Sequence, residues 1–152
     1  LMSAAASAQE LGRPGAELDS WIAVAEDVGV TAFTGKCELG QGLYTAQAQL
    51  IAEELAVPLG RVTLVQCDTD KTPDQGTTSG AQSHPANFNK TNLALAAATA
   101  REALVKLAAP RLGAEPGELI ARDGTVSMRT APGKSVAYGA LIGGRRFDPP
   151  TP

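Results

Sequence analysis

The sequence predicts an α/β (α+β) fold in which a mixed sheet packs against two helices. Its length of 152 residues corresponds to about one domain of roughly 150 residues. Short β-prone runs alternate with two stretches in which apolar residues recur at helical spacing. Glycine and proline occur 16 and 10 times, and they mark the turns between these runs. These observations favour one globular α/β domain over a disordered or fibrous chain.

Three strands are predicted in the first half of the chain. Residues 20–24 and 30–34 are short β-prone runs, and the turn-like stretch at 26–29 between them indicates a hairpin. Residues 61–66 alternate in polarity and are rich in β-branched side chains, which predicts a third strand.

Two amphipathic helices are predicted, over about residues 43–56 and 90–112. Pro58 and Gly60 end the first helix, and Gly113 fits a C-terminal cap on the second. The side chains expected to face the core are Ala46, Leu50, Ile51 and Leu55 in the first helix and Leu93, Ala97, Ala100, Leu104, Leu107 and Ala108 in the second.

The last third of the chain predicts a second hairpin and a final helix. Residues 118–121 and 125–128 flank the turn residues Asp123 and Gly124. Residues 135–142 are expected to form a short helix.

Charge and residue counts exclude several classes of site. The net charge of −3 and the pI of about 5.1 argue against a nucleic-acid partner, and aromatic residues make up only 4% of the chain. One histidine and two cysteines exclude a His-rich metal site, a four-cysteine zinc site and a disulfide framework. No run approaches the roughly 18 apolar residues that a membrane-spanning helix needs.

The N-terminal residues resemble the end of an export signal. Residues 1–8 are rich in small side chains, and Ala6-Ser7-Ala8 is a triplet that signal peptidase accepts. Cleavage after Ala8 would leave residues 9–18 as a linker and place the mature protein in the periplasm or cell envelope. An Ala-rich tail on a cytoplasmic protein is the alternative. The proline-rich residues 148–152 are interpreted as a linker toward further domains.

The first candidate site is Gly40-Gln41-Gly42, between a predicted strand and a predicted helix. Two glycines let the backbone approach a ligand, and the free N–H groups at the start of a helix favour anionic groups. The amide of Gln41 offers both a donor and an acceptor. The alternative is a tight β-to-α turn that needs glycine for its positive φ.

The second candidate site is the Gly- and hydroxyl-rich loop at residues 76–83. It lies within an irregular polar segment, residues 67–89, whose length is typical of functional or disordered loops. Such a loop can hold phosphate through backbone N–H groups, and a solvated loop is the alternative. Because ligands gather at the carboxyl ends of strands in α/β sheets, two loops from neighbouring strands are expected to share one ligand.

Other polar residues give weaker signals. His84 is interpreted as a loop residue near the site, because no carboxylate partner can be assigned to it. Cys37 and Cys67 are interpreted as small buried or half-buried residues, and a disulfide between them is the alternative if the protein is exported. Glu53 and Glu54 are expected on a helix surface.

Longer motifs resemble the molybdopterin-binding large subunits of the xanthine dehydrogenase/aldehyde oxidase family. Residues 34–45 read T-G-K-C-E-L-G-Q-G-L-Y-T, residues 49–55 read Q-L-I-A-E-E-L, and residues 78–83 read T-S-G-A-Q-S. L-D-S-W-I at 18–22 and Y-G-A-L-I-G-G at 138–144 are similar to the branch that contains isoquinoline oxidoreductase and nicotinate dehydrogenase large subunits.

The resemblance covers residues 18–147 and identifies 19–147 as the N-terminal part of a molybdopterin-binding domain. It implies that Gln41 contacts the dithiolene and molybdenum side of the cofactor, and that Thr78 to Ser83 hold the pterin and pyrophosphate. The cofactor form implied is the cytosine dinucleotide, with molybdenum held by the dithiolene and by no protein ligand. The implied cofactor-binding residues are Gly40, Gln41, Gly42, Thr45, Thr78, Ser79, Gly80, Ala81, Gln82 and Ser83.

The family reaction implied is hydroxylation of a C–H group on an N-heteroaromatic ring or an aldehyde, with water as the oxygen source. Electrons would pass to a 2Fe–2S cluster in a small partner subunit, and a cytochrome c is a further expected acceptor. Export of the loaded enzyme by the twin-arginine route is typical of this branch. The partners expected are the remainder of the large subunit and the iron–sulfur subunit, with no nucleic acid.

The sequence departs from the family in ways that limit its own chemistry. The family's large subunit is several times longer, and its catalytic base is a glutamate in a C-terminal glycine-rich motif that this sequence lacks. No catalytic residue is therefore assigned, and the 152-residue chain alone is expected to be inactive. A stand-alone, non-catalytic binding or interaction domain and a general nucleotide-binding α/β module are the alternatives.

Overall fold

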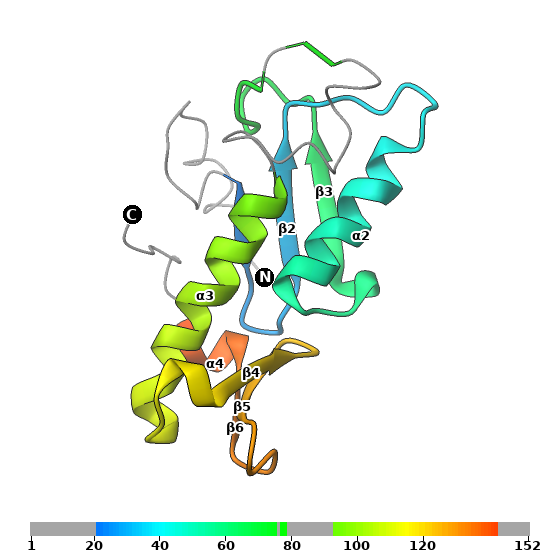
Figure 1. Cartoon of the computed structure of the whole chain (residues 1–152). Coiled ribbons are helices and arrows are strands. Elements are labelled where there is room, and N and C mark those ends of the chain that lie inside the picture. The colour runs from blue at the N-terminus through cyan, green and yellow to red at the C-terminus, as the bar shows by residue number, and fades with distance from the viewer. Residues whose placement is uncertain (1–20, 76, 79–92, 143–152) are drawn as a thin grey trace.

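The computed structural model describes residues 21–75, 77–78 and 93–142 (Figure 1). Within these residues the strands form two three-stranded sheets, with the orders β1-β2-β3 and β4-β5-β6. This arrangement confirms the α/β fold with two main helices, although the predicted strands divide between two sheets. None of the described helices is both long and apolar enough to cross a membrane.

The first sheet is mixed, as predicted. Strands β1 (Ile22–Val24) and β2 (Val30–Thr34) form the expected antiparallel hairpin, and β3 (Val62–Gln66) pairs with β2 in parallel. The parallel register runs from Val30 opposite Val62 to Thr34 opposite Gln66. Both strands therefore end at the same edge of the sheet, and the segments that follow them begin side by side.

Helices α2 (Leu43–Leu55) and α3 (Leu93–Leu112) pack against each other and lie in front of this sheet in Figure 1. The short 3-10 helix η2 (Leu59–Arg61) leads from α2 into β3. The buried side chains of the core come from both helices and both sheets. The prediction for Leu107 is wrong: its side chain is exposed, and Val105 and Ala109 are buried instead.

The second sheet is an antiparallel meander at the other end of the molecule from the carboxyl ends of β2 and β3 (Figure 1). The 3-10 helix η3 (Pro116–Glu118) leads into β4 (Leu119–Arg122), which forms the predicted hairpin with β5 (Thr125–Met128). Strand β6 (Ser135–Ala137) pairs with β5, and the short helix α4 (Tyr138–Ile142) follows.

The predicted helix at residues 135–142 is therefore half wrong. Its first three residues are β6, in which Val136 pairs with Val126 of β5. The free edge of β5 supplies backbone hydrogen-bonding partners that local sequence periodicity does not reveal. Only the remaining five residues form a helix.

The C-terminal end of α2 is hydrogen-bonded to α4 and to the turn between β4 and β5. The Tyr138 hydroxyl donates a hydrogen bond of 2.8 Å to the carbonyl oxygen of Leu55, and Gly124 N donates one of 2.8 Å to the carbonyl oxygen of Ala56. Carbonyls in the last turn of a helix lack intrahelical partners, so these bonds satisfy groups that burial would otherwise penalise. Burial also raises the pKa of Tyr138 to about 12.

The adjacent glycine brings the two halves of the fold into backbone contact. A Cβ atom on Gly139 would lie 1.8 Å from the carbonyl oxygen of Glu26, in the turn between β1 and β2. No side chain fits this gap, because the obstructing atom is backbone and not the movable end of a side chain. Position 139 therefore requires glycine for its close approach.

We expect Tyr138→Phe to lower the free energy of unfolding by about 1–3 kcal/mol, because it leaves the buried Leu55 carbonyl without its donor. Urea denaturation monitored by circular dichroism measures this loss. The matched control is Tyr44→Phe, which alters the other tyrosine of the chain, a residue 40% exposed. Equal stability losses in the two variants would contradict the role of the Tyr138 hydroxyl.

Candidate functional site

At the carboxyl edge of β2 and β3, residues 35–37, which lead into the first predicted loop, contact the start of the second loop. Cys37 N donates a hydrogen bond of 2.9 Å to Oγ1 of Thr78, and Lys36 Nζ donates one of 2.7 Å to the carbonyl oxygen of Thr77. Gly35 N donates one of 2.8 Å to Oε1 of Gln75. The expected adjacency is thus present for the described start of the second loop.

The remaining predicted residues of that loop, and the single histidine, lie outside the described residues. They are Ser79, Gly80, Ala81, Gln82, Ser83 and His84.

A disulfide bond between Cys37 and Cys67 also joins the two segments, with a Cα–Cα distance of 5.7 Å. The interpretation of the two cysteines as buried or half-buried is correct for Cys37 and wrong for Cys67, which is exposed, and the alternative of a disulfide is confirmed. The reason is the parallel pairing of β2 with β3, which brings the two strand ends together. Cys67 N also donates a hydrogen bond of 3.0 Å to the carbonyl oxygen of Thr34, the last residue of β2.

Glu38 occupies the amide groups at the start of α2. Its carboxylate accepts hydrogen bonds from Gly40 N at 2.7 Å, Gly42 N at 3.0 Å and Tyr44 N at 2.8 Å. The bond from Tyr44 N and then that from Gly42 N hold the pKa of Glu38 below its usual range. The expectation that these amides are free for an external anion is therefore wrong, because a carboxylate of the chain already binds them.

Gln41 lies at an exposed position between the two glycines. Its Nε2 donates a hydrogen bond of 2.9 Å to the carbonyl oxygen of Cys37, and its Oε1 accepts one from Leu39 N. The side chain therefore folds back onto its own loop in this structure. Leu39 itself is 77% exposed.

Gly40 and Gly42 fit both interpretations of the sequence, a tight turn that needs glycine and a backbone that a ligand can approach. Their φ angles are +98° and +79°, so the turn requires glycine for its backbone conformation. A Cβ at either position would meet no atom within 4 Å, so the space beside this backbone is open. Thr45, in the first turn of α2, is also exposed. The turn is therefore both conformationally demanding and accessible.

Sequence reasoning missed a set of four polar residues beneath the two loops, of which Thr34 and Gln47 are buried and Gln66 and Gln75 half-buried. Thr34 ends β2, Gln47 lies in α2, Gln66 ends β3 and Gln75 lies in the segment after β3. No motif links these residues, and the only signal was the presence of glutamine and threonine in otherwise apolar elements. Among the described residues, no three His, Cys, Asp or Glu side chains come together in a way that could hold a metal ion.

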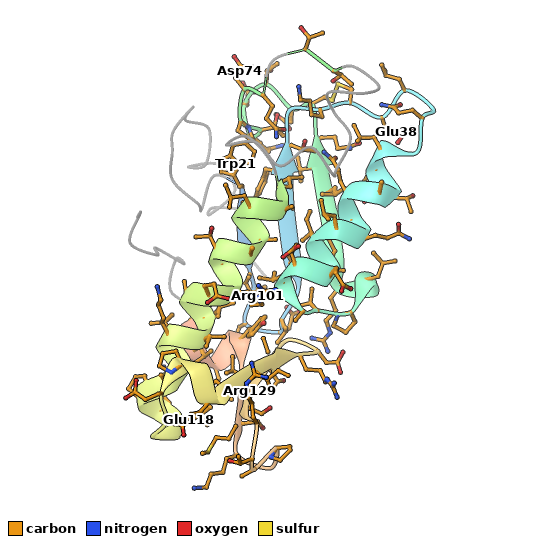
Figure 2. The ribbon with its side chains drawn as sticks, in the orientation of Figure 1. Trp21, Glu38, Asp74, Arg101, Glu118 and Arg129 are labelled. Carbon is orange, nitrogen blue, oxygen red and sulfur yellow. A yellow bond between two sulfur atoms is a disulfide. The ribbon has the colours of Figure 1, made fainter. Side chains whose placement is uncertain are left out.

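Figure 2 places Glu38 and Asp74 at the same end of the molecule, one at the start of α2 and the other in the segment after β3. Arg101, on α3, lies far from this end. Its guanidinium bonds the carbonyl oxygen of Glu54 at 2.8 Å and lies 3.6 Å from the Glu54 carboxylate. The site therefore contains acidic and neutral polar groups, and Lys36 is the lysine that bridges its two loops.

We expect the order of the first loop to depend on the charge of Glu38. Because its pKa is lower in the folded state, the stabilisation is complete above the unfolded pKa of about 4.3 and is lost as pH falls through the folded pKa. Backbone amide protection of Gly42 and Tyr44, measured by NMR hydrogen exchange, should fall in that acidic range. Glu38→Gln should reduce the protection already at pH 7, whereas Glu53→Gln should not; equal protection in both would contradict this role.

Comparison with known proteins gives a consistent result. The family model described as the molybdopterin cofactor-binding domain matches residues 3–148. The chain is 39% identical over 129 residues to a nicotinate dehydrogenase subunit of Pseudomonas putida, and the match covers 85% of this chain and 10% of that protein.

Two solved structures share the fold. Quinoline 2-oxidoreductase from Pseudomonas putida 86 superposes with a TM-score of 0.67 at 25% identity, and CO dehydrogenase from Oligotropha carboxidovorans with 0.68 at 26% identity. Each match covers 80% of this chain and 15% of the solved chain, so the chain spans a small part of these relatives. By the family match over nearly its whole length, this chain belongs to the molybdopterin cofactor-binding domain family of xanthine dehydrogenase-type large subunits.

Proposed function

We propose that this chain is the part of a molybdenum hydroxylase large subunit that binds the molybdopterin cofactor between its two loops. The observation that carries the proposal is the meeting of the loops at the carboxyl edge of β2 and β3, where Cys37 N bonds Thr78 Oγ1. Ligands of open α/β sheets bind at such an edge. The family membership supplies the class of ligand.

The donor groups at this edge fit a large polar cofactor. Gly40 and Gly42 leave open space beside their backbone, and Gln41 between them is exposed. An amide side chain can donate to an oxo group or a sulfur and can also accept from a pterin N–H group. Only a modest rearrangement is needed, because the Gln41 bonds to Cys37 and Leu39 lie within one short loop.

The charges of the loops suggest how they divide the cofactor between them. Glu38 carries a negative charge and takes the amides at the start of α2, so a pyrophosphate group would be repelled there. Lys36 and the hydroxyl of Thr78 lie on the side of the second loop. We therefore assign Gln41 to the dithiolene and molybdenum end and residues 78–83 to the pterin and pyrophosphate, with Gly40, Gly42 and Thr45 beside Gln41.

When bound, the cofactor would supply a molybdenum centre for the hydroxylation of an activated C–H group of an N-heteroaromatic ring or an aldehyde, with oxygen from water. This chain contributes binding and orientation, and the catalytic base belongs to another part of the large subunit. The other partners in this proposal are an iron–sulfur subunit with a 2Fe–2S cluster and a cytochrome c. The cytosine dinucleotide is the proposed form of the cofactor.

We also propose that the protein functions in the periplasm or cell envelope after export by the twin-arginine route. The disulfide between Cys37 and Cys67 supports this location, because structural disulfides persist mainly in oxidising compartments. The small-residue triplet Ala6-Ser7-Ala8 supports it independently as a cleavage site.

Gln41→Ala should weaken cofactor retention about three- to tenfold, the effect of losing one or two hydrogen bonds to the ligand. Elemental analysis for molybdenum, per mole of the purified native assembly, measures it. Gln49→Ala is the matched control, because Gln49 is an exposed glutamine of the same region that the proposal leaves without a role. Molybdenum content that stays at the wild-type level in Gln41→Ala would refute the assignment. A wild-type assembly without molybdenum would favour a non-catalytic domain.

Export predicts a mature N-terminus at Gln9. Mass spectrometry of the native protein from the periplasmic fraction should find cleavage after Ala8 and the disulfide between Cys37 and Cys67 intact. A native protein in the cytoplasmic fraction that retains residues 1–8 would overturn the proposed location.

A further inference from the structure

A buried hydroxyl lies between the two loops. Thr34 Oγ1 donates a hydrogen bond of 2.7 Å to Oε1 of Gln75 and accepts bonds from Gln47 Nε2 at 3.3 Å and Lys36 N at 3.2 Å. The Thr34 side chain is 0% exposed. A hydroxyl has one donor and two acceptor sites, so all of its capacity is used.

The chain of hydrogen bonds continues in both directions. Gln66 Nε2 donates to Oε1 of Gln47 at 3.2 Å, and Gly35 N donates to Oε1 of Gln75 at 2.8 Å. These bonds connect the ends of β3 and β2 with the middle of α2 and with the segment after β3. We call the four side chains Thr34, Gln47, Gln66 and Gln75 the polar network; Thr34 and Gln47 are buried, and Gln66 and Gln75 are half-buried.

The network fixes the segment that leads into the second loop. A Cβ on Gly35 would lie 2.3 Å from the carbonyl oxygen of Pro73 and 3.3 Å from Gln75 N, so this segment lies directly against the end of β2. Three residues after Gln75 comes Thr78, whose hydroxyl accepts from Cys37 N. The position of Gln75 therefore determines where the second loop begins relative to the first.

Shape alone does not require these polar groups. A valine at position 34 would have nearly the volume of threonine and would suit a buried strand end better, because buried polar groups are unfavourable unless fully hydrogen-bonded. The network instead ties together four elements that converge on the two loops. A buried hydroxyl whose hydrogen bonds are all formed, such as that of Thr34, favours one arrangement of the groups around it.

We propose that Thr34 is a positioning residue. Through its hydrogen bonds with Gln47 and Gln75, it holds the two cofactor loops in a fixed position relative to each other. This inference rests on the proposed function, since it assigns a second layer of residues to the same site. It predicts that the cofactor dissociates faster when the Thr34 hydroxyl is removed, although Thr34 itself does not touch the ligand. The contacts to Gln41 and to Thr78 then no longer form together.

The test compares Thr34→Val with Thr34→Ser in the native assembly. Thr34→Val removes the hydroxyl and with it the hydrogen bonds to Gln75 Oε1, from Gln47 Nε2 and from Lys36 N, whereas Thr34→Ser retains it. We expect the rate of molybdenum loss after dilution to rise about fivefold in Thr34→Val and to return to the wild-type rate in Thr34→Ser. Thr31→Val, on the same strand and outside the network, is the matched control.

A second readout does not depend on the cofactor. Hydrogen exchange followed by mass spectrometry should become faster in both loop segments of Thr34→Val, with other segments unchanged. Tyr138→Phe serves as the control for stability: it should lower the urea midpoint without changing exchange in the loops or molybdenum loss. If Thr34→Val does not accumulate as folded protein, Gln75→Leu removes the acceptor of the same Thr34–Gln75 hydrogen bond without altering β2, and it should have the same effects.

The outcomes separate the two proposals. If the wild-type assembly contains molybdenum and Thr34→Val or Gln75→Leu loses it at the wild-type rate, the positioning role is overturned and the proposed function stands. If Thr34→Ser fails to restore retention, the hydroxyl is not the determinant and the inference is also overturned. A wild-type assembly that contains no molybdenum overturns the proposed function and, with it, the role of the network.

Discussion

The parallel pairing of β2 with β3 is the constraint on which the rest of the site depends. It places Thr34 opposite Gln66, so that the segments after both strands leave the same edge of the sheet. Only this register puts Cys37 within bonding distance of Cys67 and brings the segment of Gln75 against the end of β2. The strand pairing determines this arrangement, and the disulfide and the hydrogen bonds between the loops stabilise it.

Hydrogen bonds from outside the helix hold both ends of α2. This helix has 13 residues and a length of roughly 20 Å at 1.5 Å per residue. Its first turn is bound by Glu38, while the carbonyls of Leu55 and of the following Ala56 accept hydrogen bonds from Tyr138 of α4 and from Gly124 in the turn between β4 and β5. The helix is therefore held at both ends by residues outside it, at one end through a carboxylate and at the other through a tyrosine hydroxyl and a glycine N–H.

The local sequence pattern was sufficient to predict most elements of the fold, because the spacing of apolar residues distinguishes strands from helices and the turn residues mark where they end. It failed for β6, whose strand conformation depends on the exposed edge of β5. The prediction was also wrong for Leu107, because helical spacing does not reveal whether a residue at the border of the apolar face is covered by a neighbouring element. The glycine turn was found from its motif. The network of Thr34, Gln47 and Gln75 could not be predicted in this way, because it joins residues that are far apart in the sequence.

The position of Glu38 changes which kind of ligand group the glycine turn is expected to bind. Free amides at a helix start would favour phosphate, and the sequence pattern alone pointed to that use. With the carboxylate bound to Gly42 N and Tyr44 N, the first loop instead presents an open glycine backbone and a neutral amide next to a negative charge. Such a surface offers a hydrogen-bonding amide and disfavours the doubly charged pyrophosphate of a cofactor. In the proposed function this difference between the loops gives the cofactor its direction across the edge of the sheet.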